Sequence, residues 1–208
     1  MKMGWQYLRG LTIAAIMSGG LALAGPAQAQ FSEGYRFLEA VKKLDGTKVT
    51  DMLADPSVSI NTRDVTSGET ALHAVVQKRN QVWVDFLLQK GANPNIADVK
   101  GVTPLMLAAN LGFLEGVQSL INGGARVDTS NQTGETPLIT AVHRRDVAMV
   151  RALLKAGANA DRADNSGRSA RDYASFDGRG SAVLTEIEAA AKAKSAGGSA
   201  KTFGPSLP

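Results

Sequence analysis

Cysteine is absent from the 208 residues of the chain. That absence excludes thiol nucleophiles, redox Cys-x-x-Cys pairs, iron–sulfur clusters and cysteine zinc sites, and it removes the residue that a lipoprotein acylates. Histidine is scarce as well, because the 2 histidines, His73 and His143, stand 70 positions apart. Isolated histidines, serines without a nucleophile elbow and scattered carboxylates form neither a catalytic triad nor a metal site. We therefore predict no catalytic residues, no metal, no cofactor and no enzymatic activity.

A strong excess of either charge is also missing. The chain carries 23 Lys and Arg against 19 Asp and Glu, and removal of Lys2 and Arg9 with the N-terminal segment discussed next would leave 21 against 19, or +2. A chain this close to balance does not have the electrostatic footprint of a nucleic-acid binder. We expect no nucleic-acid partner.

Long apolar runs are missing too, apart from one short run near the start. Residues 11–24 are apolar or small almost throughout, follow Lys2 and Arg9, and precede Ala27-Gln28-Ala29. The run is shorter than the ~20 residues that span a bilayer, and the order of the parts is typical of a secretory signal. We predict a signal peptide at 1–29, a mature protein that begins at Gln30, a periplasmic location and no membrane contact after cleavage. A retained membrane anchor is the alternative.

What the chain has instead is a repeat. Four glycines follow one another at a step of 33 residues, and similar phrases follow each of them. The phrases are Gly68-Glu-Thr-Ala-Leu, Gly101-Val-Thr-Pro-Leu, Gly134-Glu-Thr-Pro-Leu and Gly167-Arg-Ser-Ala-Arg. A second phrase keeps the same step at Gly91-Ala-Asn, Gly124-Ala-Arg and Gly157-Ala-Asn. A fixed period in this range is typical of stacked supersecondary units.

The middle repeat predicts two helices. Thr103 is a good helix N-cap, and Pro104 suits the first turn, where its missing N–H is not needed. Gly112 ends this helix, a second helix is expected over 114–122, and Gly124 supplies a left-handed C-terminal residue. The flanking repeats predict the same pairs at 71–76 with 83–88 and at 137–142 with 147–154. The closing pair is expected at 170–176 with 182–191.

The period and both phrases agree in register with the ankyrin repeat, which this layout resembles. The resemblance implies an all-α solenoid of helix-turn-helix units joined by short β-turn fingers, with three full repeats between two degenerate caps. Asn61 stands 34 residues before Asn95, which indicates one inserted residue in the first finger. The repeat domain covers 35–192. Its expected parts are a leader at 30–34, an N-terminal cap at 35–64, repeats at 65–97, 98–130 and 131–163, a C-terminal cap at 164–192 and a disordered tail at 193–208.

The resemblance also implies a binding face. Ankyrin arrays commonly bind proteins on a concave face made by the fingers and first helices, so we expect a monomer with a protein partner. The positions assigned to this face, which we call the concave strip, are Glu69, Lys78, Lys100, Val102, Asn110, Leu111, Glu135, His143 and Arg144. Val99, Val102 and Leu111 would form an apolar centre with a charged rim, which suits protein binding. The alternative is that these apolar side chains rest against their own repeat.

The roles of the two histidines and the function of the whole protein remain to be predicted. The resemblance gives His73 a structural role, with its ring bonded to a threonine hydroxyl and nearby backbone. For His143, next to Arg144 and Arg145, a solvated helix end and a partner contact both stay open. The function expected is a periplasmic protein-binding module. A narrower role as an accessory or protective factor for an exported enzyme stays open, because the sequence does not separate the two. The alternative is an enzyme or a cell-wall ligand binder with an unrecognised site.

Overall fold

The structure is a computed structural model that describes residues 33–176 and 181–199. These residues all belong to one compact unit, Phe31–Pro208. The predicted signal peptide at 1–29 and residues 200–208 of the predicted tail lie outside the described residues.

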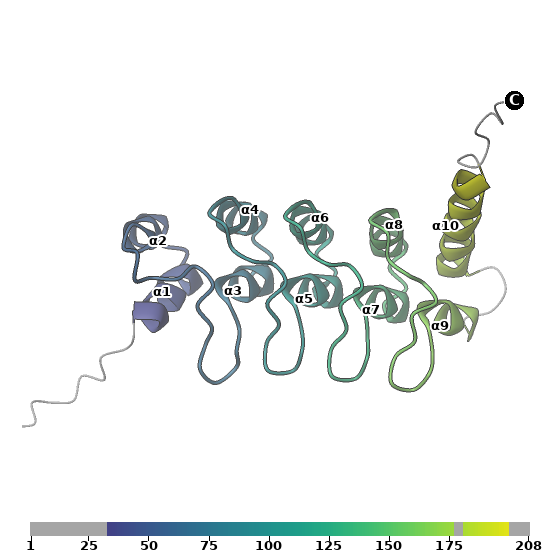
Figure 1. Cartoon of the computed structure of the whole chain (residues 1–208), viewed down its shortest axis with the longest axis horizontal. Helices are drawn as coiled ribbons and strands as arrows, with labels where there is room; N and C mark the ends of the chain where they lie inside the picture. The colour runs from purple at the N-terminus through teal and green to yellow at the C-terminus, as the bar shows by residue number, and fades with distance from the viewer. Residues whose placement is uncertain (1–32, 177–180, 200–208) are drawn as a thin grey trace, which may run out of the picture. The chain divides into compact units, whose positions relative to one another are not determined.

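The described part of the chain folds into ten helices (Figure 1). They are α1 (Glu33–Lys42), α2 (Gly46–Leu53), α3 (Ala71–Gln77), α4 (Gln81–Gln89), α5 (Pro104–Leu111), α6 (Leu114–Asn122), α7 (Pro137–His143), α8 (Val147–Lys155), α9 (Ala170–Phe176) and α10 (Ala182–Ser199). The β structure recorded in these ranges is limited to isolated bridges from Arg63 to Thr70 and from Ala163 to Ser169. The all-α prediction is confirmed.

The helices form two rows. The odd-numbered helices contact one another in chain order from α1 to α9 and make the inner row. The even-numbered helices α4, α6, α8 and α10 make the outer row, and each helix also packs on its own partner. Figure 1 shows the fingers as loops that project from the inner row, one before each of α3, α5, α7 and α9. Each finger therefore lies beside the first turn of an inner helix.

The caps and core of the middle repeats follow from their sequence. The Thr103 hydroxyl accepts a hydrogen bond from the backbone N–H of Met106 at 3.3 Å, and Pro104 occupies the first turn of α5. Leu105 is fully buried between the rows, and Ala108 is fully buried on the same helix. A small residue is needed at 108 because α5 packs against α3 on one side and α7 on the other.

The 33-residue step of the finger glycines has a geometric cause. All four glycines adopt the left-handed conformation, with φ of 71° at Gly68, 78° at Gly101, 79° at Gly134 and 80° at Gly167. A Cβ on Gly101 would also lie 3.2 Å from the Cα of Asn131 in the next finger. Only glycine fits this site, because the fingers approach one another so closely.

The first finger contains the predicted extra residue. In that finger the N–H of Gly68 reaches the carbonyl of Asp64, four positions back, at 2.9 Å. In the second finger the N–H of Gly101 reaches Asp98, only three positions back, at 3.1 Å. The insertion is therefore accommodated inside the turn.

The two ends differ from the predicted boundaries. Helix α1 begins at Glu33, inside the predicted leader at 30–34. Helix α10 continues to Ser199, so residues 193–199 extend a helix that we expected to give way to a disordered tail at residue 193. The extension has a simple reason, since residues 189–195 are alanine, lysine and serine, and alanine and lysine favour helix. At 18 residues, α10 is twice as long as α8, which has 9.

Candidate protein-binding surface

Each finger presents one residue to the end of the inner helix that follows it. The register gives four such pairs: Glu69 with Gln77, Val102 with Asn110, Glu135 with His143, and Arg168 with Phe176. In the first repeat the Gln77 amide donates to the Glu69 carboxylate at 3.1 Å. In the C-terminal cap the Arg168 guanidinium lies 5.6 Å from the centre of the Phe176 ring. One backbone position therefore carries different chemistry in each repeat.

The third repeat has the densest cluster on this surface. His143 Nδ1 lies 3.3 Å from Glu135 Oε1, which also accepts a hydrogen bond from the Thr140 hydroxyl at 3.1 Å. The His143 ring meets Tyr173 edge-on at 4.5 Å. His143 is therefore held by neighbours on both sides, although 47% of its side chain remains exposed.

Tyr173 connects this cluster to the last finger. Its hydroxyl donates to the Asp164 carboxylate at 2.7 Å. The Ser166 hydroxyl first and Tyr173 second hold the pKa of Asp164 far below its usual range, so this carboxylate stays ionised. Tyr173 and Phe176 were not among the predicted strip residues, because we treated the cap only as a closing unit. The 33-residue step would have found Tyr173, which stands one repeat after Thr140.

The predicted apolar centre is not uniform. Val99 is 54% exposed at a fingertip. Val102 is only partly exposed, and Leu111 is partly buried against the hydrophobic core, together with Leu107. Leu111 is thus partly covered by the core, while Val99 is exposed at the surface.

The polar members of the concave strip are accessible. Lys78 and Arg144 are exposed at the C-caps of α3 and α7. Lys100 is exposed at the tip of the second finger, and Asn110 is exposed on α5. The strip therefore joins finger residues to the ends of the inner helices along three successive repeats.

His73 is structural, as predicted. The Thr70 N–H donates to its Nδ1 at 3.1 Å, and the Thr70 hydroxyl lies 3.0 Å from the same atom. Nε2 lies 3.0 Å from the carbonyl of Val102 in the next finger, and since a carbonyl only accepts, Nε2 carries the proton. Burial lowers the pKa of His73, although the Val102 carbonyl opposes that shift. The neutral ring ties the first repeat to the second.

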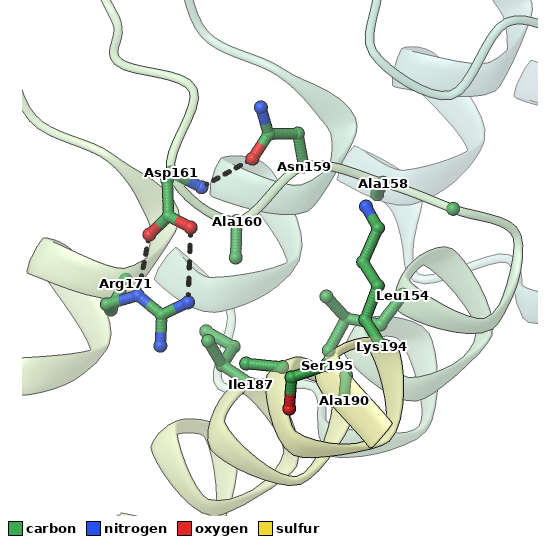
Figure 2. Close-up of a pocket in the computed structure, with 12 residues that line it drawn as sticks. Leu154, Ala158, Asn159, Ala160, Asp161, Arg171, Ile187, Ala190, Lys194 and Ser195 are labelled. Carbon is green, nitrogen blue, oxygen red and sulfur yellow. Dashed lines mark hydrogen bonds and ion pairs between the residues drawn. The ribbon is translucent and has the colours of Figure 1, made fainter. Parts of the chain in front are cut away.

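A cavity lies beside α10, away from the concave strip. This cavity of about 530 Å³ separates the loop at 157–161 from α10, with Leu154 and Ile187 among its lining residues. Figure 2 shows Arg171 paired with Asp161 on one side of it and Lys194 on the other. The pair is 2.6 Å long and lowers the pKa of Asp161, so this carboxylate is not poised as an acid or base near neutral pH.

Sequence reasoning missed this cavity, because it depends on the extension of α10. In the described ranges, no group of three His, Asp or Glu side chains could hold a metal ion. None of the helices described in the structure has the length and apolar character needed to cross a bilayer.

Comparison with known proteins agrees with the geometry. A family model described as ankyrin repeats (3 copies) matches residues 36–131 and 105–187. The chain belongs to the ankyrin repeat family. Such arrays are protein–protein interaction modules and are generally not enzymes.

Curated relatives from distant sources are similar over part of their length. An ankyrin repeat protein of fowlpox virus is 38% identical over 68 residues, which are 33% of this chain and 20% of the viral protein. The ankyrin repeat protein YahD of Escherichia coli is 36% identical over 77 residues, 35% of this chain and 38% of the relative. An ankyrin repeat protein of Acanthamoeba polyphaga mimivirus is 37% identical over 84 residues, 39% of this chain and 11% of the relative. The chain therefore matches less than half of each relative.

Proposed function

We propose that this ankyrin array works in the periplasm as a monomeric accessory factor, which binds an exported enzyme through the concave strip and protects it. One observation carries the protein-binding part of the proposal. A single backbone position, where each finger meets its inner helix, displays a carboxylate–amide pair, a carboxylate–imidazole pair and a cation–aromatic pair in different repeats. A regular scaffold with varied exposed side chains is suited to recognising one particular protein surface.

The strip has the composition expected of a binding surface. The strip exposes charged side chains at Lys78, Lys100 and Arg144. An apolar group adjoins it at Val99, next to Lys100, and an aromatic group adjoins it at Tyr173, which contacts His143. Desolvated aromatic and apolar anchors usually supply most of the binding energy, and rim charges contribute less. We therefore place the anchors at the His143–Tyr173 contact and at Val99.

The periplasmic part of the proposal rests on the N-terminal residues. Lys2 and Arg9, the apolar run at 11–24 and Ala27-Gln28-Ala29 follow the order of a cleaved secretory signal. The test is intact-mass analysis of the protein in a periplasmic fraction. A mass that begins at Gln30 supports export, and a protein that retains residues 1–29 contradicts it.

The binding part is tested by affinity capture from a periplasmic extract with two matched triple variants. The first truncates exposed strip residues: Lys100→Ala, Asn110→Ala and His143→Ala. The second truncates exposed residues of the outer helices: Lys90→Ala, Gln118→Ala and Lys155→Ala. Arg151 is unsuitable as a control, because it bonds to Glu186 of α10 at 3.0 Å and its loss would disturb the cap.

The expected result is that the strip variant loses the captured protein and the outer variant retains it. If the outer variant alone loses the partner, binding through the concave strip is wrong. The protective role is tested separately by heating the captured enzyme with the wild-type array or with the strip variant. Faster inactivation with the strip variant supports protection, and equal rates contradict it.

A further inference from the structure

The turns between inner and outer helices carry an uneven distribution of charge. Three of them contain two consecutive basic residues: Lys42-Lys43 after α1, Lys78-Arg79 after α3 and Arg144-Arg145 after α7. The turn after α5 is neutral and reads Leu111-Gly112. All six basic side chains are exposed. We call Lys43, Lys78, Arg79 and Arg144 the basic row.

The charges of this row are not neutralised inside the fold. Lys42, outside the row, pairs with Glu39 at 3.2 Å. Over the residues that the structure describes, no carboxylate lies within ion-pair distance of any member of the basic row. Four positive charges therefore remain available at one edge of the array.

The acids nearest to the row in sequence are already engaged. Asp45 accepts a hydrogen bond from the backbone N–H of Lys48 at 3.0 Å, and Asp146 accepts one from Met149 at 3.0 Å. Both carboxylates cap the N-terminus of an outer helix. Glu115 at the start of α6 is also exposed near the neutral turn. Glu69 is bonded by Gln77, and Glu135 by Thr140 and His143.

Two members of the row converge on the neutral turn. Arg79 donates to the carbonyls of Leu111 at 3.0 Å and Gly112 at 3.1 Å, and its guanidinium lies 5.8 Å from the Phe113 ring centre. Arg144 comes from the opposite side, where its Nη2 lies 2.8 Å from the place that a Cβ on Gly112 would occupy. Carbonyls and a ring, and not an acid, hold Arg79 in place, so its charge is oriented without being cancelled.

We infer that the basic row binds an acidic segment of a protein partner, in which carboxylates stand at multiples of about 10 Å and the place opposite the neutral turn can be apolar. That interval follows from the 8–10 Å spacing of packed helices, which separates one turn from the next. An extended chain advances about 3.3 Å per residue, so an interval of about 10 Å corresponds to acidic residues about three positions apart in the segment. The partly exposed Leu107 and Leu111 of α5 lie between the charges and suit apolar residues in the same segment. This inference rests on the proposed function, because it names the chemistry of the protein that the array binds.

The observations favour a protein over a nucleic acid. At each charged turn the row is only one or two residues wide. The aromatic ring beside Arg79, Phe113, is 3% exposed and is not available to stack on bases. A neutral repeat with two leucines in the middle of the row also suits a polypeptide better than a continuous phosphate backbone.

The test uses fluorescence anisotropy with the full chain and a synthetic fluorescent peptide. The peptide carries glutamate at every third position with leucine and serine between, and its control carries glutamine in place of glutamate. The double charge reversal Lys78→Glu/Arg144→Glu should weaken peptide binding at least about tenfold at low salt. Binding should also fall as salt rises, because the row is exposed and the Debye length shrinks to about 10 Å at 0.1 M.

The matched control is Lys90→Glu/Lys155→Glu. It makes the same change in net charge, also at the C-terminal ends of two helices, but on the outer row. It should leave peptide affinity within about twofold of wild type. The inference is overturned if the two double variants weaken binding equally, or if the glutamine peptide binds as well as the glutamate peptide.

Other ligands have their own outcomes. An oligonucleotide or a phosphatidylglycerol vesicle that binds more tightly than the peptide, and is released by Lys78→Glu/Arg144→Glu, would replace the protein segment as the ligand and contradict the inference. The proposed function fails separately. If the strip triple variant loses a captured protein while the basic-row variant retains it, the array binds a protein partner but not through an acidic segment.

Discussion

The full repeats and the C-terminal cap differ in how each unit is joined to the next. In the first two full repeats, the residue at the end of the connecting loop accepts a hydrogen bond from the backbone of the next repeat. Asn95 accepts a hydrogen bond from the N–H of Arg126 at 2.8 Å, and Asp128 accepts one from Asn159 at 2.9 Å. Asp161 occupies the next equivalent position, and it pairs with Arg171 of the cap. The interior repeats are thus joined through backbone, and the last one is closed by a side-chain ion pair.

The same contrast holds in the core. Leu105 and Leu138 are fully buried on the inner helices, but one repeat later the position is Arg171, which is only partly buried. The cap compensates with the long helix α10, whose Val183 and Ile187 are buried and whose Glu186 bonds to Arg151 of α8. Interior repeats therefore bury an apolar side chain between two neighbours, whereas the cap has a charged side chain at the same position.

The largest expected effect is at the core position of a full repeat. Leu138→Ala should destabilise the protein by about 2–5 kcal/mol, because the cavity lies between two helix rows that cannot collapse around it. Arg171→Ala at the equivalent cap position should cost about 1 kcal/mol or less, since the Asp161 partner of its ion pair is 64% exposed. Urea unfolding followed by circular dichroism measures both. Equal losses would show that the cap is packed like a repeat.

The second effect concerns overpacking between repeats. Ala108→Leu should destabilise the protein by about 1–3 kcal/mol, because α5 is held between α3 and α7 and has no free volume at this side chain. Ala189→Leu on the exposed side of α10 is the matched change in the cap and should stay within about 0.5 kcal/mol of wild type. An unchanged urea midpoint for Ala108→Leu would contradict the register of the inner row.

The third effect tests the forward hydrogen bonds. Asn95→Ala removes the bond from Arg126 and a second bond from the Asn95 amide to the carbonyl of Gly124, and should cost about 1–2 kcal/mol. Asp161→Ala, where the third repeat meets the cap, should cost about 0–1 kcal/mol, because 64% of the Asp161 side chain is exposed. If Asp161→Ala proves the more damaging of the two in the same urea assay, the contrast between backbone and side-chain closure is wrong.

The smallest effect depends on pH and concerns His73. Burial lowers its pKa in the folded state below the ordinary 6.5, so below that pH the unfolded chain binds a proton that the folded chain does not. Stability therefore falls as pH drops through 6.5 and stops falling below the folded-state pKa. His73→Met introduces the residue that the second repeat has at this position, Met106, and should remove that part of the pH dependence. Urea midpoints of both proteins between neutral pH and pH 5 provide the measurement, and identical slopes would contradict the buried neutral ring.

The sequence predicted the parts of this molecule that the backbone dictates. Gly101 and Gly134 must be glycine because of their left-handed conformation and the nearby fingers. Their spacing therefore defines the repeat, and the positions of the helix pairs follow from it. Thr103 with Pro104 marked the start of α5, and the second helix of that repeat begins and ends at the predicted residues.

The remainder depends on side chains that reach across repeats. Nothing in the local sequence shows that Arg79 reaches the carbonyl of Leu111, because that bond joins neighbouring repeats. The prediction made α10 too short, because the glycines and prolines near the chain end indicated a disordered tail while the alanines at 189–193 favour helix. The cavity beside α10 depends on that extension and was missed with it.

The central claim is that the concave strip forms the protein-binding surface. Hydrogen–deuterium exchange of the full chain, with and without the captured partner, tests it most directly. The account predicts slower exchange on binding in the fingers at 97–103 and 130–136 and in the turns at 110–113 and 143–146, with α4, α6 and α8 unchanged. Protection confined to α4, α6, α8 or α10, with the fingers unchanged, would contradict it.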